Sequence, residues 1–351
     1  MPGTFDHGYA LLVGVGQCSY MPWSLPTTVL DSKAIREILV DTGLCGYDPQ
    51  HIRLLNDAEA KRETILDGLG WLKQQASGDA EAMVVVYFSG HGWVDEAAQK
   101  YYLITNDVDA LDVPNTALTA EAFASGLRDI SARRLLTIID ACHAEGVAKA
   151  KDGAAKPVKL PPGFDKSAPP PSLVEALRQG EGRAVFSSSR GKQRSYIRKD
   201  EKLSIFTYHL IEALQGANNK TGDTQVKLSN LMNHLSTAVP ESAQKEYHTE
   251  QVPFFDMAAE DYPVSVAVLR GGKGLPPGGW AAVQEQAHDK VSQIVQAIGE
   301  RSVAIGGDAK NSVIITGNGN KVQRGKYNIN IDKANGLAIG DNARVDAPDD
   351  E

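Results

Sequence analysis

Val84-Val85-Val86-Tyr87-Phe88-Ser89-Gly90-His91-Gly92 is a run of β-favouring apolar residues that ends in small and reactive ones, and Leu135-Leu136-Thr137-Ile138-Ile139-Asp140-Ala141-Cys142-His143 has the same form. An apolar run of this length, bounded by turn residues, is typical of a strand buried on both faces in a parallel sheet. In open α/β sheets, reactive groups collect at the carboxyl ends of such strands. The two stretches therefore predict that His91 and Cys142 meet at one edge of the sheet, as the base and the nucleophile of a cysteine-dependent site.

Each stretch ends in a motif with a family resemblance. Tyr-Phe-Ser-Gly-His-Gly at 87–92 and Asp-Ala-Cys-His at 140–143 resemble the two catalytic motifs of the caspase-like peptidases. The second motif is similar to that of metacaspases and bacterial caspase homologues, whereas animal caspases have Gln-Ala-Cys-Arg-Gly. A separation of about 50 residues between His and Cys is also that of the family. The resemblance covers roughly residues 5 to 260 and implies an α/β fold, a mostly parallel sheet flanked by helices.

The resemblance implies a role for each reactive residue. Cys142 is the nucleophile, His91 is its base, and the backbone N–H groups of Gly92 and Cys142 hold the oxyanion. A base is needed because an ordinary thiol, with a pKa of about 8.5, is mostly protonated at neutral pH. His143 competes for this role by adjacency, but consecutive residues of a strand point apart.

Two aspartates stand where the family binds the substrate side chain. The resemblance places Asp31 and Asp140 at the S1 pocket, with Ser89 as a third contact. Such a site favours Arg or Lys at P1, the residue before the scissile bond, and rejects Asp by like-charge repulsion. A second interpretation applies to Asp31 alone: helical spacing of apolar residues predicts a helix over 28–39, and a carboxylate in its first turn offsets the helix dipole.

Composition limits the class of protein. A formal net charge of −8 over 351 residues argues against a general nucleic-acid binder, which needs clustered Lys and Arg. Three cysteines give no disulfide framework, and a nucleophilic thiol favours a reducing compartment. The first residues lack a signal peptide, and no apolar run approaches the ~20 residues of a membrane helix. We therefore expect a cytoplasmic protein that contacts no membrane, acts on protein substrates, and needs no cofactor or metal.

Three other interpretations stay open at this stage. The first is that the chain is a catalytically silent caspase-like scaffold, although both Cys142 and His91 are present. Alternatively, Cys142 and His143 belong to a metal or redox site, although no other Cys or His pair has ligand spacing. Finally, Asp107, Asp109 and Asp112 lie in one predicted loop and offer the oxygen ligands that calcium prefers, although solvated acidic loops are much commoner.

The chain divides into a peptidase domain and a tail. The predicted domain covers residues 1–265 and contains a flexible linker over 148–172, where Lys, Ala, Gly and Pro predominate. In the family this linker separates the large and small subunits, and its lysines make it a candidate for cleavage by this protease or by an upstream one. Further helices are predicted over 59–75, 120–127, 204–214 and 225–235.

The tail has a different composition. A linker is predicted over 266–279, an amphipathic helix over 280–300, and a Gly- and Asn-rich β-type module over 301–351, in which Val303–Ala309 is echoed by Leu337–Ala343. This module resembles prion-type signalling motifs of bacterial and fungal death effectors, whose Asn ladders stack. A small ordered β module or a disordered tail is an equal alternative. The resemblance implies an effector of antiphage defence or programmed cell death, with an assembly partner bound through 301–351.

Overall fold

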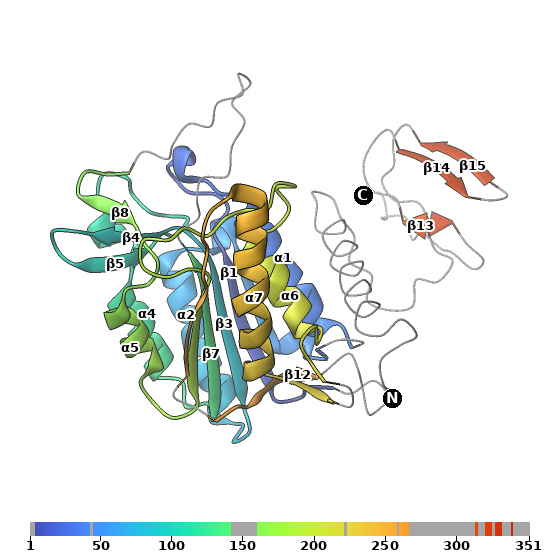
Figure 1. The fold of residues 1–351 in the computed structure, drawn as a ribbon, viewed down its shortest axis with the longest axis horizontal. Coiled ribbons are helices and arrows are strands. Elements are labelled where there is room, and N and C mark those ends of the chain that lie inside the picture. The colour runs from blue at the N-terminus through green and yellow to red at the C-terminus, as the bar shows by residue number, and fades with distance from the viewer. Residues whose placement is uncertain are drawn as a thin grey trace, which may run out of the picture. The chain divides into compact units, whose positions relative to one another are not determined.

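The structure is a computed structural model that describes residues 4–42, 45–141, 160–220, 223–257 and 260–266, together with the backbone of four short strands after residue 312. It divides into two compact units, Met1–Ser292 and Gln293–Glu351. The first unit contains the predicted three-layer α/β arrangement (Figure 1).

A six-stranded sheet forms the middle layer, in the order β11-β9-β7-β3-β1-β2. Five strands are parallel and β11 runs antiparallel to β9. The centre of the sheet is apolar on both faces: every residue of β1 and β3 is buried, as the uninterrupted runs of Val, Leu and Tyr predict. The bounds are β1 Gly8–Gly14, β2 Ile52–Asn56, β3 Met83–Gly90, β7 Arg134–Ala141, β9 Arg183–Ser187 and β11 Phe254–Met257.

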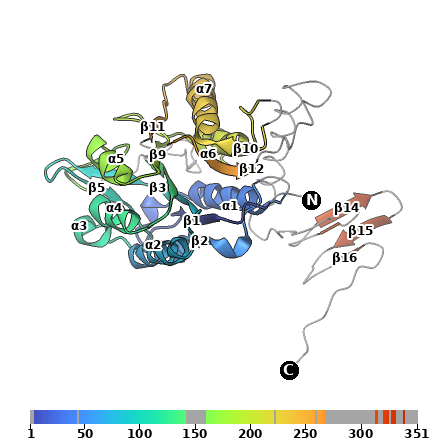
Figure 2. The ribbon, with the colours of Figure 1, turned by 90° about the horizontal axis from the view of Figure 1, so that it is seen from below.

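Helices cover both faces of this sheet, as Figure 2 shows. On one side α1 packs on β1 and β3, and α6 packs on α1 and α7. On the other side α2 contacts β1, and α4 lies between α2 and α5. The bounds are α1 Thr27–Val40, α2 Arg62–Ser77, α4 Ala120–Arg128, α5 Pro171–Arg178, α6 Ile205–Leu214 and α7 Leu228–Tyr247. The predicted helices at 28–39, 59–75, 120–127 and 204–214 are thus confirmed with small shifts at their ends.

Smaller elements complete the first unit. Beyond the carboxyl end of β3, an antiparallel sheet forms in the order β6-β5-β4-β8. A two-stranded sheet joins β10 to β12 near the other end of the molecule. The bounds are β4 Gly92–Asp95, β5 Lys100–Leu103, β6 Leu118–Thr119, β8 Phe164–Lys166, β10 Gln225–Lys227, β12 Pro263–Val266, α3 Val113–Thr116 and the 3₁₀ helices Met21–Trp23, Pro49–His51 and Asp57–Glu59.

Two of the predicted boundaries are wrong. The helix expected over 225–235 begins as the strand β10, and α7 then continues to Tyr247 through Pro240, because apolar residues keep their helical spacing beyond 235. The linker expected over 148–172 is too long at its C-terminal end. Phe164–Lys166 pairs with β4, and α5 begins at Pro171, where proline suits the first turn of a helix. Residues 148–159 lie outside the described part of the chain.

The second unit is described only in part. β13 (Val313–Ile314) pairs antiparallel with β16 (Ala338–Ile339), and β14 (Asn320–Arg324) pairs antiparallel with β15 (Tyr327–Ile331). The predicted linker over 266–279 overlaps β12 at Val266, and the rest of it lies outside the described residues, as does the predicted helix over 280–300. Within the described residues, no helix has the length and hydropathy needed to cross a membrane.

Candidate active site

The pairing of β3 with β7 brings the two predicted catalytic positions to one edge. The parallel register aligns Ser89 with Asp140 and Gly90 with Ala141. The next residues along the two strands are His91 and Cys142. Cys142 and His143 lie outside the described residues, so the structure describes the base side of the predicted dyad and the strand that leads to its thiol.

A backbone carbonyl orients His91. The ring is 3% exposed, and its Nε2 lies 3.0 Å from the carbonyl oxygen of Trp23. A carbonyl can only accept, so this contact assigns the imidazole proton to Nε2 and the lone pair of the neutral ring to Nδ1. Trp23 is held in turn by edge-on ring contacts with Tyr20 and Trp93. In this tautomer Nδ1 can accept a proton, as a general base must.

Gly92 occupies a position that tolerates no side chain. A Cβ at Gly92 would lie 1.8 Å from the Tyr101 hydroxyl and 3.0 Å from the Ala141 Cβ. The residue begins β4, whose partner β5 holds Tyr101. The side chains of Tyr101 and Ala141 can lie this close to the residue after His91 only because that residue is glycine.

Three predicted substrate-binding residues form one buried group. Asp31, Ser89 and Asp140 are each fully buried. The Ser89 hydroxyl donates to Asp31 Oδ2 at 3.1 Å, and the Ser204 backbone N–H donates to Asp31 Oδ1 at 2.9 Å. These residues come from α1, β3 and β7 and from the N-cap of α6, so the pairing of distant segments creates the group.

Hydroxyl groups surround the Asp140 carboxylate. Ser195 donates to Oδ1 at 2.8 Å, and Ser204 and Thr207 donate to Oδ2 at 2.5 and 3.1 Å. Ser204 also caps α6, because its Oγ accepts the Thr207 N–H at 2.9 Å. The buried Gln251 amide donates to Ser195 Oγ at 3.2 Å. The N-cap and first turn of α6 therefore supply two of the hydrogen bonds that hold the Asp140 carboxylate.

The two carboxylates repel one another. Burial raises the pKa of Asp31 well above its usual value, and the negative charge of Asp140 raises it further, while the hydrogen bonds from Ser204 and Ser89 act against both. Burial and the same two aspartates also raise the pKa of Tyr87, so its phenol stays neutral and donates to Thr207 at 2.6 Å. Asp31 and Asp140 thus form a buried like-charge pair in which ionising both groups is costly.

The other two thiols are unreactive. Cys18 and Cys45 are free and buried, and burial raises the pKa of each thiol to about 12, with smaller contributions from neighbouring groups. A thiol with such a pKa forms almost no thiolate at neutral pH. Of the three cysteines, only Cys142 remains as a candidate nucleophile.

Comparison with protein families now adds to this geometry. The model of the caspase domain matches residues 7–260. This chain belongs to the caspase family. The family is one of cysteine peptidases, which agrees with the base and the strand pairing described above.

Solved structures resemble the chain at low identity. A protein from Geobacter sulfurreducens is 15% identical, with a TM-score of 0.47, and the match covers 76% of this chain and 99% of the other. Caspase-1 from Spodoptera frugiperda is 15% identical, with a TM-score of 0.46, covering 78% and 93%. The pro-form of that caspase is 13% identical, with a TM-score of 0.44, covering 74% and 94%. Comparison with curated proteins finds no match.

Several residues of this caspase site have no individual sequence signal. Ser195, Ser204 and Gln251 contact the carboxylates or their partners, and Trp23 orients His91, yet none follows a buried strand that would mark it. Ser204 does have a local sign, since serine before an apolar helix predicts an N-cap. The placement of Asp31 also needs correction. α1 begins at Thr27, so Asp31 lies beyond the first turn, and the helix-dipole interpretation does not apply.

The aspartates of the predicted acidic loop accept local hydrogen bonds that hold turns and the start of a helix. Asp107 accepts from the Thr105 hydroxyl at 2.8 Å and from the Arg62 backbone N–H at 3.1 Å, at the first residue of α2. Asp109 accepts from the Leu111 N–H, and Asp112 from the Asn115 amide. These contacts are those of turn and cap residues, and they leave the calcium interpretation without support from the described geometry.

Gly92→Ala should inactivate the protein although it removes no reactive group. The new Cβ would collide with Tyr101 and displace β4 from His91, and a misplacement of about 1 Å costs about 10²-fold in rate. The measurement is kcat/KM on a peptide substrate. Gly70→Ala is the matched control, because a Cβ there meets nothing within 4 Å. Full activity of Gly92→Ala would contradict the geometry.

Asp31→Asn should stabilise the fold at neutral pH. The raised pKa of Asp31 means that its contribution to stability is present below the unfolded pKa and is lost as pH rises through the folded pKa. Asparagine keeps the acceptor for Ser204 and carries no charge. We expect a Tm several degrees higher at pH 7 and a smaller difference near pH 4. Asp67→Asn, on the exposed face of α2, should show no such pH dependence, and an unchanged Tm for Asp31→Asn at pH 7 would refute the like-charge pair.

Proposed function

We propose that this chain is a cysteine endopeptidase that cuts after Arg or Lys, with Cys142 as nucleophile and His91 as base. The observation that carries the specificity is the buried pair of Asp31 and Asp140. The charged neighbour that most affects Asp31 is the negative Asp140, so the two carboxylates concentrate negative charge in one buried place. A guanidinium or ammonium group bound between the carboxylates would supply a compensating cation.

The chemistry follows from the orientation of His91. Its Nδ1 accepts the Cys142 proton, and the thiolate attacks the carbonyl carbon of the P1 residue. The oxyanion is held by the backbone N–H groups of Gly92 and Cys142. Collapse of this intermediate breaks the C–N bond, and the amine leaves with the proton from His91. Water then hydrolyses the thioester and restores the thiol.

The same carboxylates exclude an acidic substrate. An aspartate at P1 would be a third negative charge beside a pair that already resists double ionisation. The surrounding hydroxyls of Ser195, Ser204 and Thr207 are neutral donors that fix the carboxylates without cancelling their charge. A positive substrate charge therefore suits this arrangement better than a negative one.

Reporter peptides that differ only at P1 test the proposal. We expect turnover after Arg and Lys, none after Asp, and none with Cys142→Ala. Asp140→Asn should lower kcat/KM for the Arg peptide by about 30-fold or more, the loss typical of removing one partner of a buried charge pair. Alkylation of Cys142 should be unchanged in that variant, and Asp67→Asn should act normally. Cleavage after Asp alone would overturn the specificity, and no turnover on any peptide would favour the catalytically silent scaffold.

We further propose that the chain is an effector of bacterial antiphage defence or programmed cell death, activated by proteolysis or by assembly. The support is the lysine-rich linker that follows Cys142 and the Gly- and Asn-rich tail after residue 301. Clustering through such a tail raises the effective concentration of one protease domain toward another.

Fragment mapping on three proteins tests this activation. The intact chain should yield two fragments cut within the linker, between Lys149 and Lys159. Cys142→Ala should stay whole unless an active protease is added in trans. Deletion of 302–351 should spare hydrolysis of the Arg peptide by the cut enzyme but abolish signal-dependent cutting. An uncut chain with full activity would refute the linker proposal, and loss of the folded peptidase domain on deletion would make the tail structural.

A further inference from the structure

Two helices place three potential metal ligands side by side, away from the dyad. His209 and Glu212 lie three residues apart on α6 and therefore share one face of the helix. His234 comes from α7, which packs on that face. Nδ1 of His209, a carboxylate oxygen of Glu212 and Nε2 of His234 all lie within 4.8 Å of one another.

We propose that His209, Glu212 and His234 form a binding site for a divalent transition metal ion, with zinc as the best match, that fastens α6 to α7. Two imidazoles and one carboxylate are a common set of zinc ligands, and imidazole favours zinc, copper or nickel over calcium or magnesium. Water would complete the coordination. Sequence spacing alone does not predict this site, because His234 is 22 residues from Glu212 in the chain.

The distances suit such an ion. Glu212 Oε2 lies 2.6 Å from His209 Nδ1 and 3.0 Å from His234 Nε2. Zinc bonds of about 2.0–2.1 Å in tetrahedral geometry separate the ligand atoms by about 3.3 Å. Zinc binding would therefore widen the two contacts to Glu212 by less than about 1 Å. The three ligand atoms lie within 4.8 Å of one another, so the two imidazole nitrogens would approach each other to reach the same separation.

The outer partner of one ligand is already in place. His209 Nε2 lies 2.7 Å from the Ser242 hydroxyl on α7. Without metal, Nδ1–H of His209 donates to Glu212 and Ser242 donates to Nε2. With metal on Nδ1, the proton moves to Nε2, which then donates to Ser242. A ligating histidine generally has such a hydrogen-bonded partner, which fixes its ring.

The site is accessible, and its carboxylate lies between the two histidines. The side chains of His209, Glu212 and His234 are 11%, 15% and 13% exposed, so an ion can reach them from solvent. The Glu212 carboxylate contacts one histidine from each helix and is thus placed between the other two ligands.

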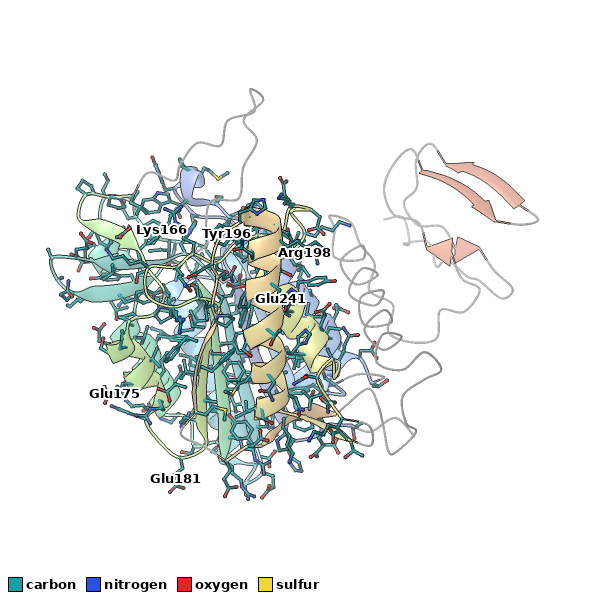
Figure 3. All side chains as sticks on the ribbon, viewed as in Figure 1. Lys166, Glu175, Glu181, Tyr196, Arg198 and Glu241 are labelled. Atoms are coloured by element: carbon teal, nitrogen blue, oxygen red, sulfur yellow. The ribbon has the colours of Figure 1, made fainter. Side chains whose placement is uncertain are left out.

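The site is connected to the carboxylate pair through α6. Thr207, which donates to Asp140, lies two residues before His209 on this helix. Between them Tyr208 stacks against the Arg198 guanidinium, 3.7 Å from its ring centroid. Figure 3 shows that Arg198 and Tyr196 both lie beside one end of α7. Fixing α6 against α7 would therefore stiffen the helix that holds Asp140.

Zinc titration of the full-length Cys142→Ala chain, without a histidine tag, tests the proposal. This background removes the thiol that would otherwise compete for zinc, so the result is independent of the proposed peptidase activity. We expect one zinc per chain by equilibrium dialysis, and a Tm rise of about 5–10 °C at a zinc concentration 100-fold above Kd. His234→Ala and Glu212→Gln should abolish both effects, and Ser242→Ala should weaken binding by about 10-fold.

His7→Ala is the matched control. His7 also pairs with a carboxylate, Asp79 at 2.9 Å, but on the exposed surface and without a third ligand, so this variant should bind zinc normally. Far-UV circular dichroism checks that each variant is folded. If His234→Ala is unfolded, Glu212→Gln alone tests the proposal. Absence of zinc binding, or binding that persists unchanged in Glu212→Gln and His234→Ala, would overturn the proposal.

Discussion

The repulsion between two buried carboxylates, Asp31 and Asp140, is the constraint around which the site is arranged. Asp31 comes from α1 and Asp140 from the end of β7, and neither is exposed to solvent. Placing them together has an electrostatic cost, which the fold offsets with Ser89, Ser195, Ser204 and Thr207 as hydrogen-bond donors. A structural role alone would be served better by neutral residues, and this supports the proposal of a substrate with positive charge.

The first turn of α6 connects the chemistry to the rest of the fold. Ser204 ends an extended segment, caps the helix, and contacts both aspartates through its N–H and hydroxyl. Movement of α6 would therefore alter the proposed substrate-binding group without a direct effect on His91, which contacts the Trp23 carbonyl. The Asp140 contacts and the orientation of His91 can therefore vary independently. A metal ion that bridges α6 and α7 would act on the Asp140 contacts.

Sequence alone predicts the sheet well because its strands are continuous apolar runs. His91 and Cys142 are the residues that follow β3 and β7 in the sequence, and the motif resemblance gives the partners Asp31, Ser89 and Asp140. The hydroxyl donors and the Trp23 carbonyl could not be predicted, because a serine or a backbone oxygen acquires its role only from tertiary contacts. The same holds for His234, which meets Glu212 across two helices, and for β8, whose strand depends on pairing with β4 rather than on its own composition.

The central claim is that charge on the Asp31 and Asp140 pair selects a basic side chain, and one ratio tests it most directly. Peptides with Arg or citrulline at P1 have nearly the same shape, but only Arg is charged. The ratio is kcat/KM for the Arg peptide divided by kcat/KM for the citrulline peptide. We predict that it is small at acid pH, rises as pH increases through the raised pKa of Asp31, and then levels off. A ratio near one at every pH would contradict the account.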